Sequence, residues 1–277
     1  MKSFLLFALS VLSFHSYSQS FLIMDNGITI TTDNHGGAYD FGHYAFPQKV
    51  TLKGGRFYVE DGNVLATVDD NGLLFKKYEV IPEDIKGKGN NYFISGEKVY
   101  GIDNQGVLKI TEDSKFKRAR IFGGNFFISQ PRPLFSELEF YMMDQSGAPV
   151  KIETGEMDLK EIIDVGGNYF MNRSGDLYTL SESGVIALKD EFRIGMLARK
   201  GSNFFIDSSN YLFTVDQNGE LHMPAIPLDL DVSSILKTGS NYFIDMEGRF
   251  YVVDDNGNVV EKIMPDHDFR MAKIVSF

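Results

Sequence analysis

The sequence predicts an all-β fold, a seven-bladed β-propeller built from four-stranded antiparallel blades. Three observations lead to this prediction: one unit recurs seven times, each copy contains four β-rich runs, and the two chain ends complete one unit between them. A fixed period in this range is typical of solenoids and propellers. Successive copies are 36, 35, 34, 43, 35 and 38 residues apart, measured between their first aromatic residues at Phe21, Phe57, Tyr92, Phe126, Tyr169, Phe204 and Tyr242.

The first two strands of each copy flank a glycine turn. In the fifth copy an apolar run at 162–165 ends at Gly166 and Gly167, and the aromatic run 169–171 follows Asn168. Two such runs around a tight turn predict a hairpin. The paired aromatic residues are large enough to fill the space between neighbouring blades, where each buries on the order of 150–250 Å².

The third strand, such as 250–253, is rich in aromatic and β-branched residues, which suit a pleated surface. It ends at an Asp-x-x-Gly turn in six copies, and the fifth copy has Ser181 ahead of Gly184. The Asp side chain caps such a turn and Gly adopts positive φ. Calcium binding is the alternative interpretation, and the turns starting at Asp69 and Asp254 are the richest in oxygen. A short fourth strand, such as 185–188, completes the unit.

An asparagine recurs before the aromatic pair in five copies. A residue that recurs in most blades is expected to have a structural role common to all of them. We therefore predict that the asparagine side chain satisfies backbone groups at the glycine turn. The residues are Asn91, Asn125, Asn168, Asn203 and Asn241.

The chain ends predict a closed ring. Residues 20–36 align without a gap on residues 241–257 but have no first strand of their own, and residues 269–277 match a first strand that no second strand follows. The C-terminal strand therefore joins the N-terminal blade, which removes exposed sheet edges.

The N-terminus reads as a secretory signal. Lys2 precedes an apolar run at 4–14 and small residues before a cut after Ser18. We therefore expect a signal peptide at 1–18 and one propeller domain at 19–277, exported to the periplasm or the extracellular space. The run is shorter than the roughly 20 residues that span a bilayer, so no membrane span is expected after signal cleavage. The absence of cysteine excludes disulfides and thiolate chemistry.

The charge limits the partners. A net charge of −11 and a pI near 4.9 leave no basic stripe to neutralise phosphates, so nucleic acid is not an expected partner. No motif indicates a cofactor, and the sequence contains no phosphate loop, HExxH or serine elbow. We expect a monomer.

The repeats resemble two known families. The pattern of 165–178, a Gly-Gly-Asn-Tyr-Phe stretch with a later Gly-x-Leu-Tyr-like run, is similar to pyrroloquinoline-quinone-type propellers and to regulator-of-chromosome-condensation-type propellers. The resemblance covers nearly the whole mature chain and implies blade architecture. Both families place a Trp in the repeat, and this chain has none. The quinone cofactor and the chromatin role are therefore not carried over.

Candidate binding residues lie where one blade differs from the others. The link between the second and third strands and the link between blades are expected on one face, and long loops on a rigid scaffold commonly carry binding. The fourth copy has an insertion at 129–138 on that face. The predicted site residues, in the insertion and in inter-blade links, are Arg132, Phe135, Glu137, His43, Tyr44, His222 and His267.

Two functions follow from this reading. The first is an exported binding or scaffold protein that recognises a protein, glycan or cell-envelope partner through the loop-rich face. The alternative is a propeller enzyme, a lyase or hydrolase, with a site in the central funnel. The first strands bring charged residues there, namely Lys53, Arg120, Asp164, Arg199 and Lys237. A metal or acid-base pair built on His43 and His267 is a further hypothesis. The sequence otherwise predicts no metal site and assigns no catalytic residue.

Overall fold

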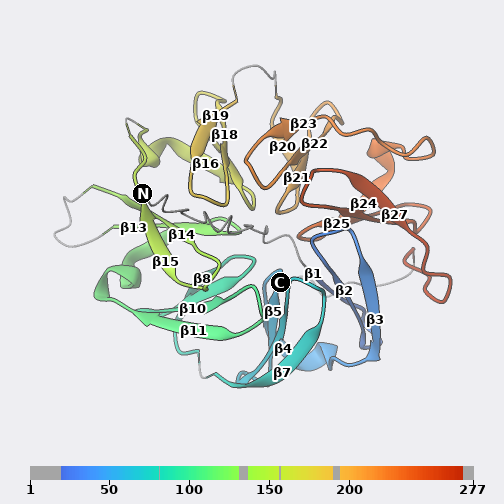
Figure 1. Cartoon of the computed structure of the whole chain (residues 1–277), viewed down its shortest axis with the longest axis horizontal. Helices are drawn as coiled ribbons and strands as arrows, with labels where there is room; N and C mark the ends of the chain where they lie inside the picture. The colour runs from blue at the N-terminus through green and yellow to red at the C-terminus, as the bar shows by residue number, and fades with distance from the viewer. Residues whose placement is uncertain (1–19, 81, 131–136, 156, 190–193, 271–277) are drawn as a thin grey trace, which may run out of the picture.

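Seven antiparallel sheets form a ring in this computed structural model (Figure 1). The structure describes residues 20–80, 82–130, 137–155, 157–189 and 194–270. Within these ranges six sheets have four strands and the first has three, all paired with their sequence neighbours. The all-β seven-bladed propeller is confirmed.

The strands of blades 1 to 4 are β1 (Ser20–Ile23), β2 (Ile28–Thr32), β3 (Ala38–His43), β4 (Val50–Lys53), β5 (Phe57–Glu60), β6 (Val64–Val68), β7 (Leu74–Glu79), β8 (Ile85–Lys88), β9 (Tyr92–Ser95), β10 (Lys98–Ile102), β11 (Leu108–Glu112), β12 (Ala119–Phe122), β13 (Phe126–Ser129), β14 (Glu139–Met143) and β15 (Pro149–Ile152). Those of blades 5 to 7 are β16 (Ile162–Val165), β17 (Tyr169–Asn172), β18 (Leu177–Leu180), β19 (Ile186–Leu188), β20 (Leu197–Lys200), β21 (Phe204–Asp207), β22 (Leu212–Val215), β23 (Leu221–His222), β24 (Ile235–Thr238), β25 (Tyr242–Asp245), β26 (Phe250–Val253) and β27 (Val259–Lys262). Short 3₁₀ turns precede four inner strands, at η1 (Pro47–Lys49), η2 (Ser114–Arg118), η3 (Leu159–Glu161) and η4 (Val232–Ser234).

The Asp-x-x-Gly turns have the predicted hairpin chemistry. In blade 2, Asp69 Oδ1 accepts hydrogen bonds from the backbone N–H groups of Asn71 at 2.9 Å and Leu73 at 2.8 Å. Gly72 has a φ of 77°, in the left-handed region that favours glycine. The turn carboxylate therefore caps its own loop.

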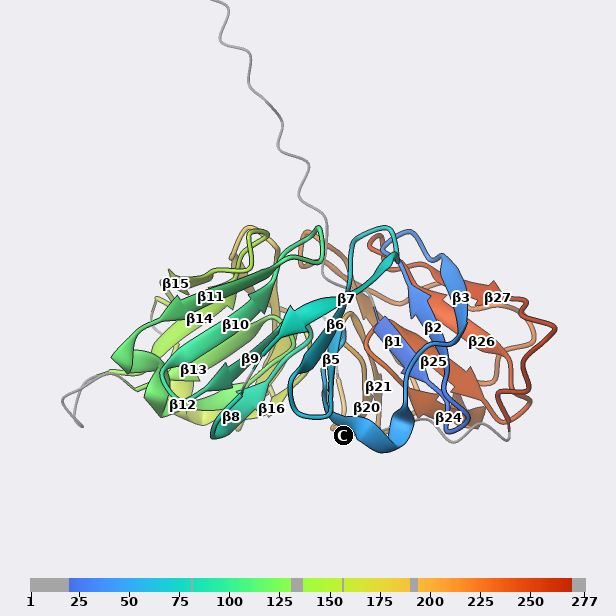
Figure 2. The same ribbon diagram turned by 90° about the horizontal axis from the view of Figure 1, so that it is seen from below.

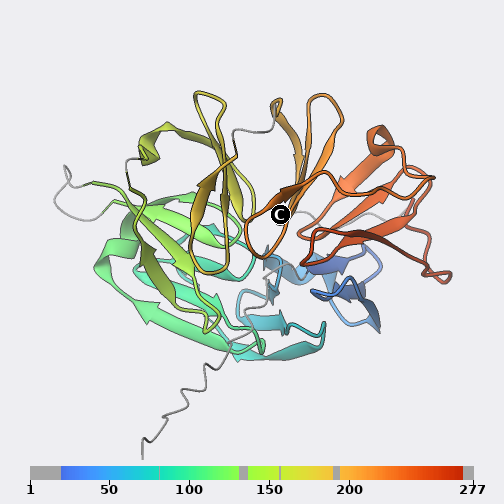
Figure 3. The ribbon, with the colours of Figure 1, turned by 45° about the horizontal axis from the view of Figure 1, so that its top comes forward.

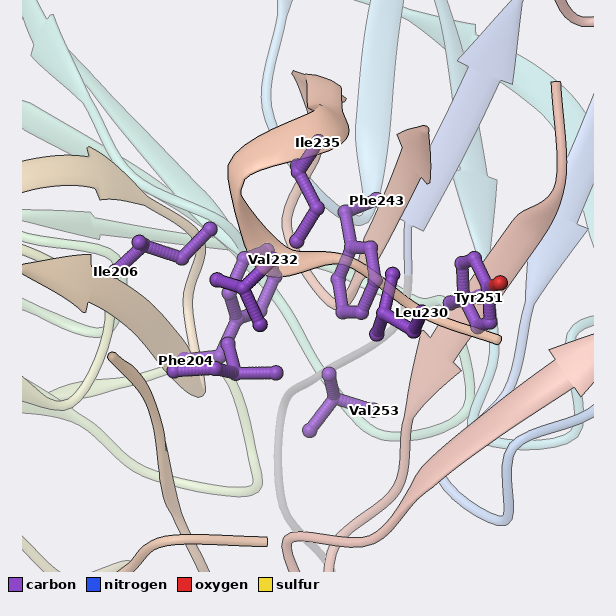
Figure 4. Packing of buried hydrophobic residues seen from close by; sticks show 9 residues of the cluster. Phe204, Ile206, Leu230, Val232, Ile235, Phe243, Tyr251 and Val253 are labelled. Carbon is purple, nitrogen blue, oxygen red and sulfur yellow. The ribbon is translucent and has the colours of Figure 1, made fainter. Parts of the chain in front are cut away.

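Aromatic side chains fill the space between blades, as predicted. The first aromatic of one blade meets the second aromatic of the next, for example Tyr169 with Phe205 at a centroid distance of 4.9 Å. Between blades 6 and 7 Phe204 and Phe243 meet at 5.5 Å within a buried cluster (Figure 4). Each interface thus has its own small apolar core, which a single blade could not form alone.

Backbone and side-chain hydrogen bonds add polar links to each interface. Asn203 Nδ2 donates to the carbonyl of Val253 in the next blade at 3.1 Å, and Asn241 Nδ2 donates to Asp33 O at 3.1 Å. In these two copies the recurring asparagine is structural, but it bonds to the end of the third strand of the neighbouring blade rather than to its own glycine turn.

Blade 1 lies beside blade 7, which closes the ring (Figure 3). Thr32 Oγ1 donates to Asn241 Oδ1 at 2.5 Å, and Asp255 N donates to Asn34 O at 2.9 Å. Phe269 is 2% exposed and packs with Leu22 of blade 1 and with residues of blade 7. The predicted closing strand lies mostly at 271–277, outside the described residues, so its pairing stays a prediction.

The ring has two different faces, seen edge-on in Figure 2. The hairpins between second and third strands lie against the inter-blade links; for example, Arg173 N donates to Glu161 O and Met246 N donates to Ser234 O, both at 2.9 Å. We call this side the loop face. The opposite side, the turn face, carries the glycine turns and the Asp-x-x-Gly turns. Over the described ranges, no helix has the length and apolarity needed to cross a membrane.

Candidate binding sites: the loop face and the central cavity

The fourth-blade insertion is only partly described. Arg132 and Phe135 lie outside the described residues, and Glu137 is exposed just ahead of β14. Glu137 borders a groove of about 390 Å³ that also includes Glu139, Lys151 and Glu153. Because Glu139 and Lys151 pair at 3.0 Å, the groove wall carries excess negative charge from Glu137 and Glu153. This groove suits a cationic group.

His43 and Tyr44 lie at the outer edge of the loop face. The exposed His43 ring contacts Asn26 O through Nδ1 at 2.8 Å. Burial, with a contribution from Glu60, raises the pKa of the Tyr44 hydroxyl. The Lys76 ammonium lies 5.5 Å from the Tyr44 ring centroid, in a cation–π contact. These residues form a polar rim rather than a metal site.

His267 has its own partner. Its Nε2 lies 2.9 Å from Asp40 Oδ2, while the His43 ring contacts Asn26. The two imidazoles are therefore engaged separately. Across the described part of the chain, no group of three His, Cys, Asp or Glu residues is placed to hold a metal ion.

His222 is not where the sequence placed it. It belongs to β23, pairs with Thr214, and its Nε2 lies 3.1 Å from Asp216 Oδ2 in the turn ahead of that strand. The fourth strand starts at the turn face, and His222 is its second residue, so this histidine lies near the turn face rather than on the loop face. The assignment to a loop was wrong because the strand was not recognised.

Several exposed apolar side chains lie in the loops of blades 6 and 7. Leu228 is fully exposed, and Ile263 is 87% exposed. Both lie in inter-blade links that form the loop face. We call the following residues the apolar loop set: Met196, Tyr211, Leu228, Met246 and Ile263. Exposed apolar side chains that form one patch mark interaction surfaces, so these residues are candidates for such a surface.

The inner strands enclose a central cavity of about 380 Å³. Six inner strands run from the loop face to the turn face and present their last residue to the cavity; the lining includes Lys53, Lys88, Phe122, Val165, Lys200 and Thr238. Residues two positions earlier are nearer the loop face, and each lies at a register shift of its inner strand, for example between Ile85 and Gly87 in β8. They are exposed and include Lys86 and Arg120. The cavity lies at the turn-face end of the inner strands, where their last residues and the glycine turns line it.

The lysines give the cavity its charge. Burial and the neighbouring Lys88 ammonium lower the pKa of Lys53 to about 8, and burial also lowers the pKa of Lys88. Lys88 Nζ donates to the backbone carbonyl of Lys53. Lys200 forms an ion pair with Asp164. The cavity therefore presents two neighbouring ammonium groups that disfavour each other's charge.

Polar side chains cross the bottom of the cavity. The Asn90 carboxamide of blade 3 donates to Ser202 Oγ of blade 6, and Ser202 Oγ is hydrogen bonded to Ser240 Oγ of blade 7. The glycine turns here are closely packed, since a Cβ on Gly124 would lie 2.5 Å from Gly167 Cα. The described residues thus form a polar floor.

A ring of polar residues is formed by the second residue of each Asp-x-x-Gly turn, and by the equivalent residue of the fifth blade. Asp70 N donates to Asn104 O, and Gln217 N donates to Asp255 O, each at 3.0 Å. Burial, followed by the carboxylates of Asp255 and Asp70, raises the pKa of Glu182 to about 9. The members of this turn ring are Asn34, Asp70, Asn104, Gln145, Glu182, Gln217 and Asp255.

Sequence reasoning identified Lys53 but missed the other lysines of the cavity. Arg120, Asp164, Arg199 and Lys237, which it also placed in the funnel, are not among the lining residues. Lys88 and Lys200 occupy the position of Lys53 in their own blades, so the repeat alignment contained the signal. Asn90 replaces a glycine of the turn, which also distinguishes blade 3. Glu182 carried no signal, because its environment comes from blades distant in sequence.

The fold is a seven-bladed propeller with exposed apolar residues on its loop face and lysines in its central cavity. No family model matches the chain, and no curated protein matches it. The similar solved structures include BamB from Moraxella catarrhalis, with 13% identity over 87% of this chain and 80% of that chain and a TM-score of 0.27. They also include a proposed 6-phosphogluconolactonase from Bacteroides uniformis, with 12% identity over 92% of this chain and 98% of that chain and a TM-score of 0.34. Similarity at this level carries no inference about ligand or activity.

Proposed function

We propose that the protein is an exported binding protein that recognises a partner protein through the loop face. The observation that carries this proposal is the apolar loop set, with Leu228 fully exposed and Ile263, Met196 and Met246 more than 60% exposed. Burying one such side chain in an interface contributes about 1.5–3 kcal/mol. A glycan surface offers less apolar area, so a protein partner fits better.

Charge adds a second criterion for the partner. The protein carries a net charge of −11, so a basic partner surface would be drawn to it electrostatically. The acidic groove beside Glu137 is one place that would receive a Lys or Arg side chain. The proposed partner therefore presents an apolar patch bordered by cations.

Photo-crosslinking of the exported chain in cells tests this proposal. A photoreactive residue at Met196 or Leu228 should give a discrete crosslinked protein, whereas the same residue at Leu73, an exposed apolar position on the turn face, should give none. With the purified partner, Leu228→Ser and Met246→Ser together should weaken binding at least tenfold. Equal crosslinking from both faces, or unchanged affinity of the double variant, would overturn the loop-face assignment.

The predicted insertion has its own test. Replacing Arg132 and Phe135 by Ala should weaken the same complex if the insertion belongs to the interface. A glycan array separates the other class of ligand, since saturable glycan binding that survives Leu228→Ser would favour a carbohydrate over a protein.

The central cavity favours the second candidate function, a propeller lyase or hydrolase. Lys53 has a lowered pKa and lines a cavity of ligand size, which are properties of amine nucleophiles and general bases. Reductive trapping with borohydride and a panel of carbonyl compounds would detect an imine at Lys53 as a mass increase. No mass increase in the wild-type protein, or the same increase in Lys53→Met, would argue against this chemistry.

A further inference from the structure

The central cavity opposes the charge of the whole molecule. The chain has 38 acidic and 27 basic residues, yet the cavity wall carries Lys53, Lys88 and Lys200. Arg120 lies nearer the loop face on β12, and Lys86 on β8 pairs with Asp84. In an acidic protein this arrangement attracts anions to the axis of the ring.

The lysines differ in their partners. The carboxylate of Asp164 is engaged by Lys200. Among the described residues, no carboxylate forms an ion pair with Lys53, and the neighbouring Lys88 is a like charge. A partly buried ammonium without a counterion is unfavourable unless a ligand supplies one.

The cavity has the dimensions and chemistry of a binding site. Its volume of about 380 Å³ falls within the roughly 300–1,000 Å³ typical of small-molecule pockets. Phe122 and Val165 give it apolar wall area, while Asn90, Ser202 and Ser240 supply polar groups at the floor. A ligand would thus meet cations on one side and hydrogen-bonding groups below.

We propose that the central cavity binds a small organic anion, bearing carboxylate or phosphate groups, through the ammonium groups of Lys53 and Lys88. The anion supplies the counter-charge that Lys53 lacks among the described residues. The polar floor at Asn90 and Ser202 orients its far end through hydrogen bonds. Because this floor spans the axis, the ligand enters from the loop face and leaves by the same route.

This site is independent of the proposed partner binding. It uses the ends of β4 and β8, whereas the apolar loop set lies in the links and hairpins around blades 6 and 7. Failure of one proposal therefore leaves the other intact. A ligand entering the central cavity and a partner on the loop face would nevertheless share one side of the ring.

Isothermal titration calorimetry on the purified full chain tests the anion site, with citrate and inorganic phosphate as probes at constant ionic strength. Either probe should bind saturably, while glycerol should not. Lys53→Met should weaken binding at least tenfold, Lys88→Met should do the same, and Lys53→Arg should stay within about threefold of wild type. Lys49→Met is the matched control, because Lys49 pairs with Asp61 at the protein surface.

The pH dependence adds a readout that a merely structural role would not produce. Between pH 9 and pH 7 Lys53 gains its proton, so affinity should rise in the wild type and stay flat in Lys53→Met. Circular dichroism checks that the variants fold. Absence of saturable binding by both probes, or equal affinity in Lys53→Met and Lys49→Met, would overturn the proposal.

Discussion

At the residue scale, single substitutions within the repeat decide what each blade contributes. Blade 2 has Arg56 where five others have asparagine, and its side chain is fully buried. Arg56 forms an ion pair with Asp70 at 3.0 Å and also donates to Val68 O at 3.2 Å. The guanidinium thus replaces the asparagine and neutralises one carboxylate of the turn ring.

Glu182 of the same ring should make stability depend on pH. Its pKa is about 9 in the folded protein, compared with an ordinary value of 4.5. The group's contribution to stability is fully present below pH 4.5 and is lost as pH rises through 9, because the unfolded chain releases the proton first. Glu182→Gln removes the ionisation, so it should be about 1–3 kcal/mol more stable than wild type at pH 8.

Urea denaturation between pH 5 and pH 9 measures this difference. The gap between Glu182→Gln and wild type should widen with pH, whereas Glu261→Gln on the exposed outer strand β27 should track the wild type. A gap that does not change with pH would contradict the assigned environment of Glu182.

At the scale of the strand, the third strands hold neighbouring blades together through one position. Thr67 Oγ1 donates to Gly106 O at 2.7 Å, and Thr31, Thr179 and Thr214 make the equivalent bond to the Asp-x-x-Gly turn of the next blade. Blade 3 has Gly101 at this position, where a Cβ would lie 2.0 Å from Gly147 O. The residue at this position therefore donates a hydrogen bond in some interfaces and allows close backbone contact in another.

Substitutions at this position should separate the two modes. Thr67→Val loses one hydrogen bond and should reduce the free energy of unfolding by about 1 kcal/mol. Gly101→Ala forces the backbones apart and should reduce it by about 3 kcal/mol. Thermal and urea unfolding measure both, and Thr67→Ser, which keeps the hydroxyl, serves as control. If Gly101→Ala left the free energy of unfolding unchanged, the backbones of the two blades would be able to move apart at little cost, contrary to this prediction.

Strand length also explains the error at His222. The fourth strand of blade 6 has two residues, compared with three to six in the other blades, and prolines at 224 and 227 follow it. Proline cannot donate a ladder hydrogen bond. A strand this short gives no alternating pattern in the sequence, so only the pairing with β22 identifies it.

At the scale of the whole molecule, stability depends on closing the ring. Phe269 packs between blades 7 and 1 and stacks on Phe250 at a centroid distance of 5.1 Å. Phe269→Ala should reduce the free energy of unfolding by about 3–5 kcal/mol. Ile263→Ala, exposed in the link just before it, should change it by less than about 0.5 kcal/mol.

Chain truncation gives a second measure of closure. A chain ending at residue 266 loses Phe269 and the predicted closing strand, so its melting temperature should fall well below that of the full chain. If Phe269→Ala and the truncated chain both melt with the wild type, the interface between blades 7 and 1 contributes little, and the ring is held by the other interfaces.

The repeat period, the turn residues and the aromatic pairs were enough to determine the propeller from the sequence. These features act within one blade or between adjacent blades, so the same local pattern appears in each of the seven copies. The tertiary structure alone decided which residues meet across the axis, because Asn90 with Ser202, and Glu182 with Asp70 and Asp255, come from blades far apart in the chain. A local sequence pattern cannot predict these contacts across the axis, because they depend on how the seven blades close around a common centre.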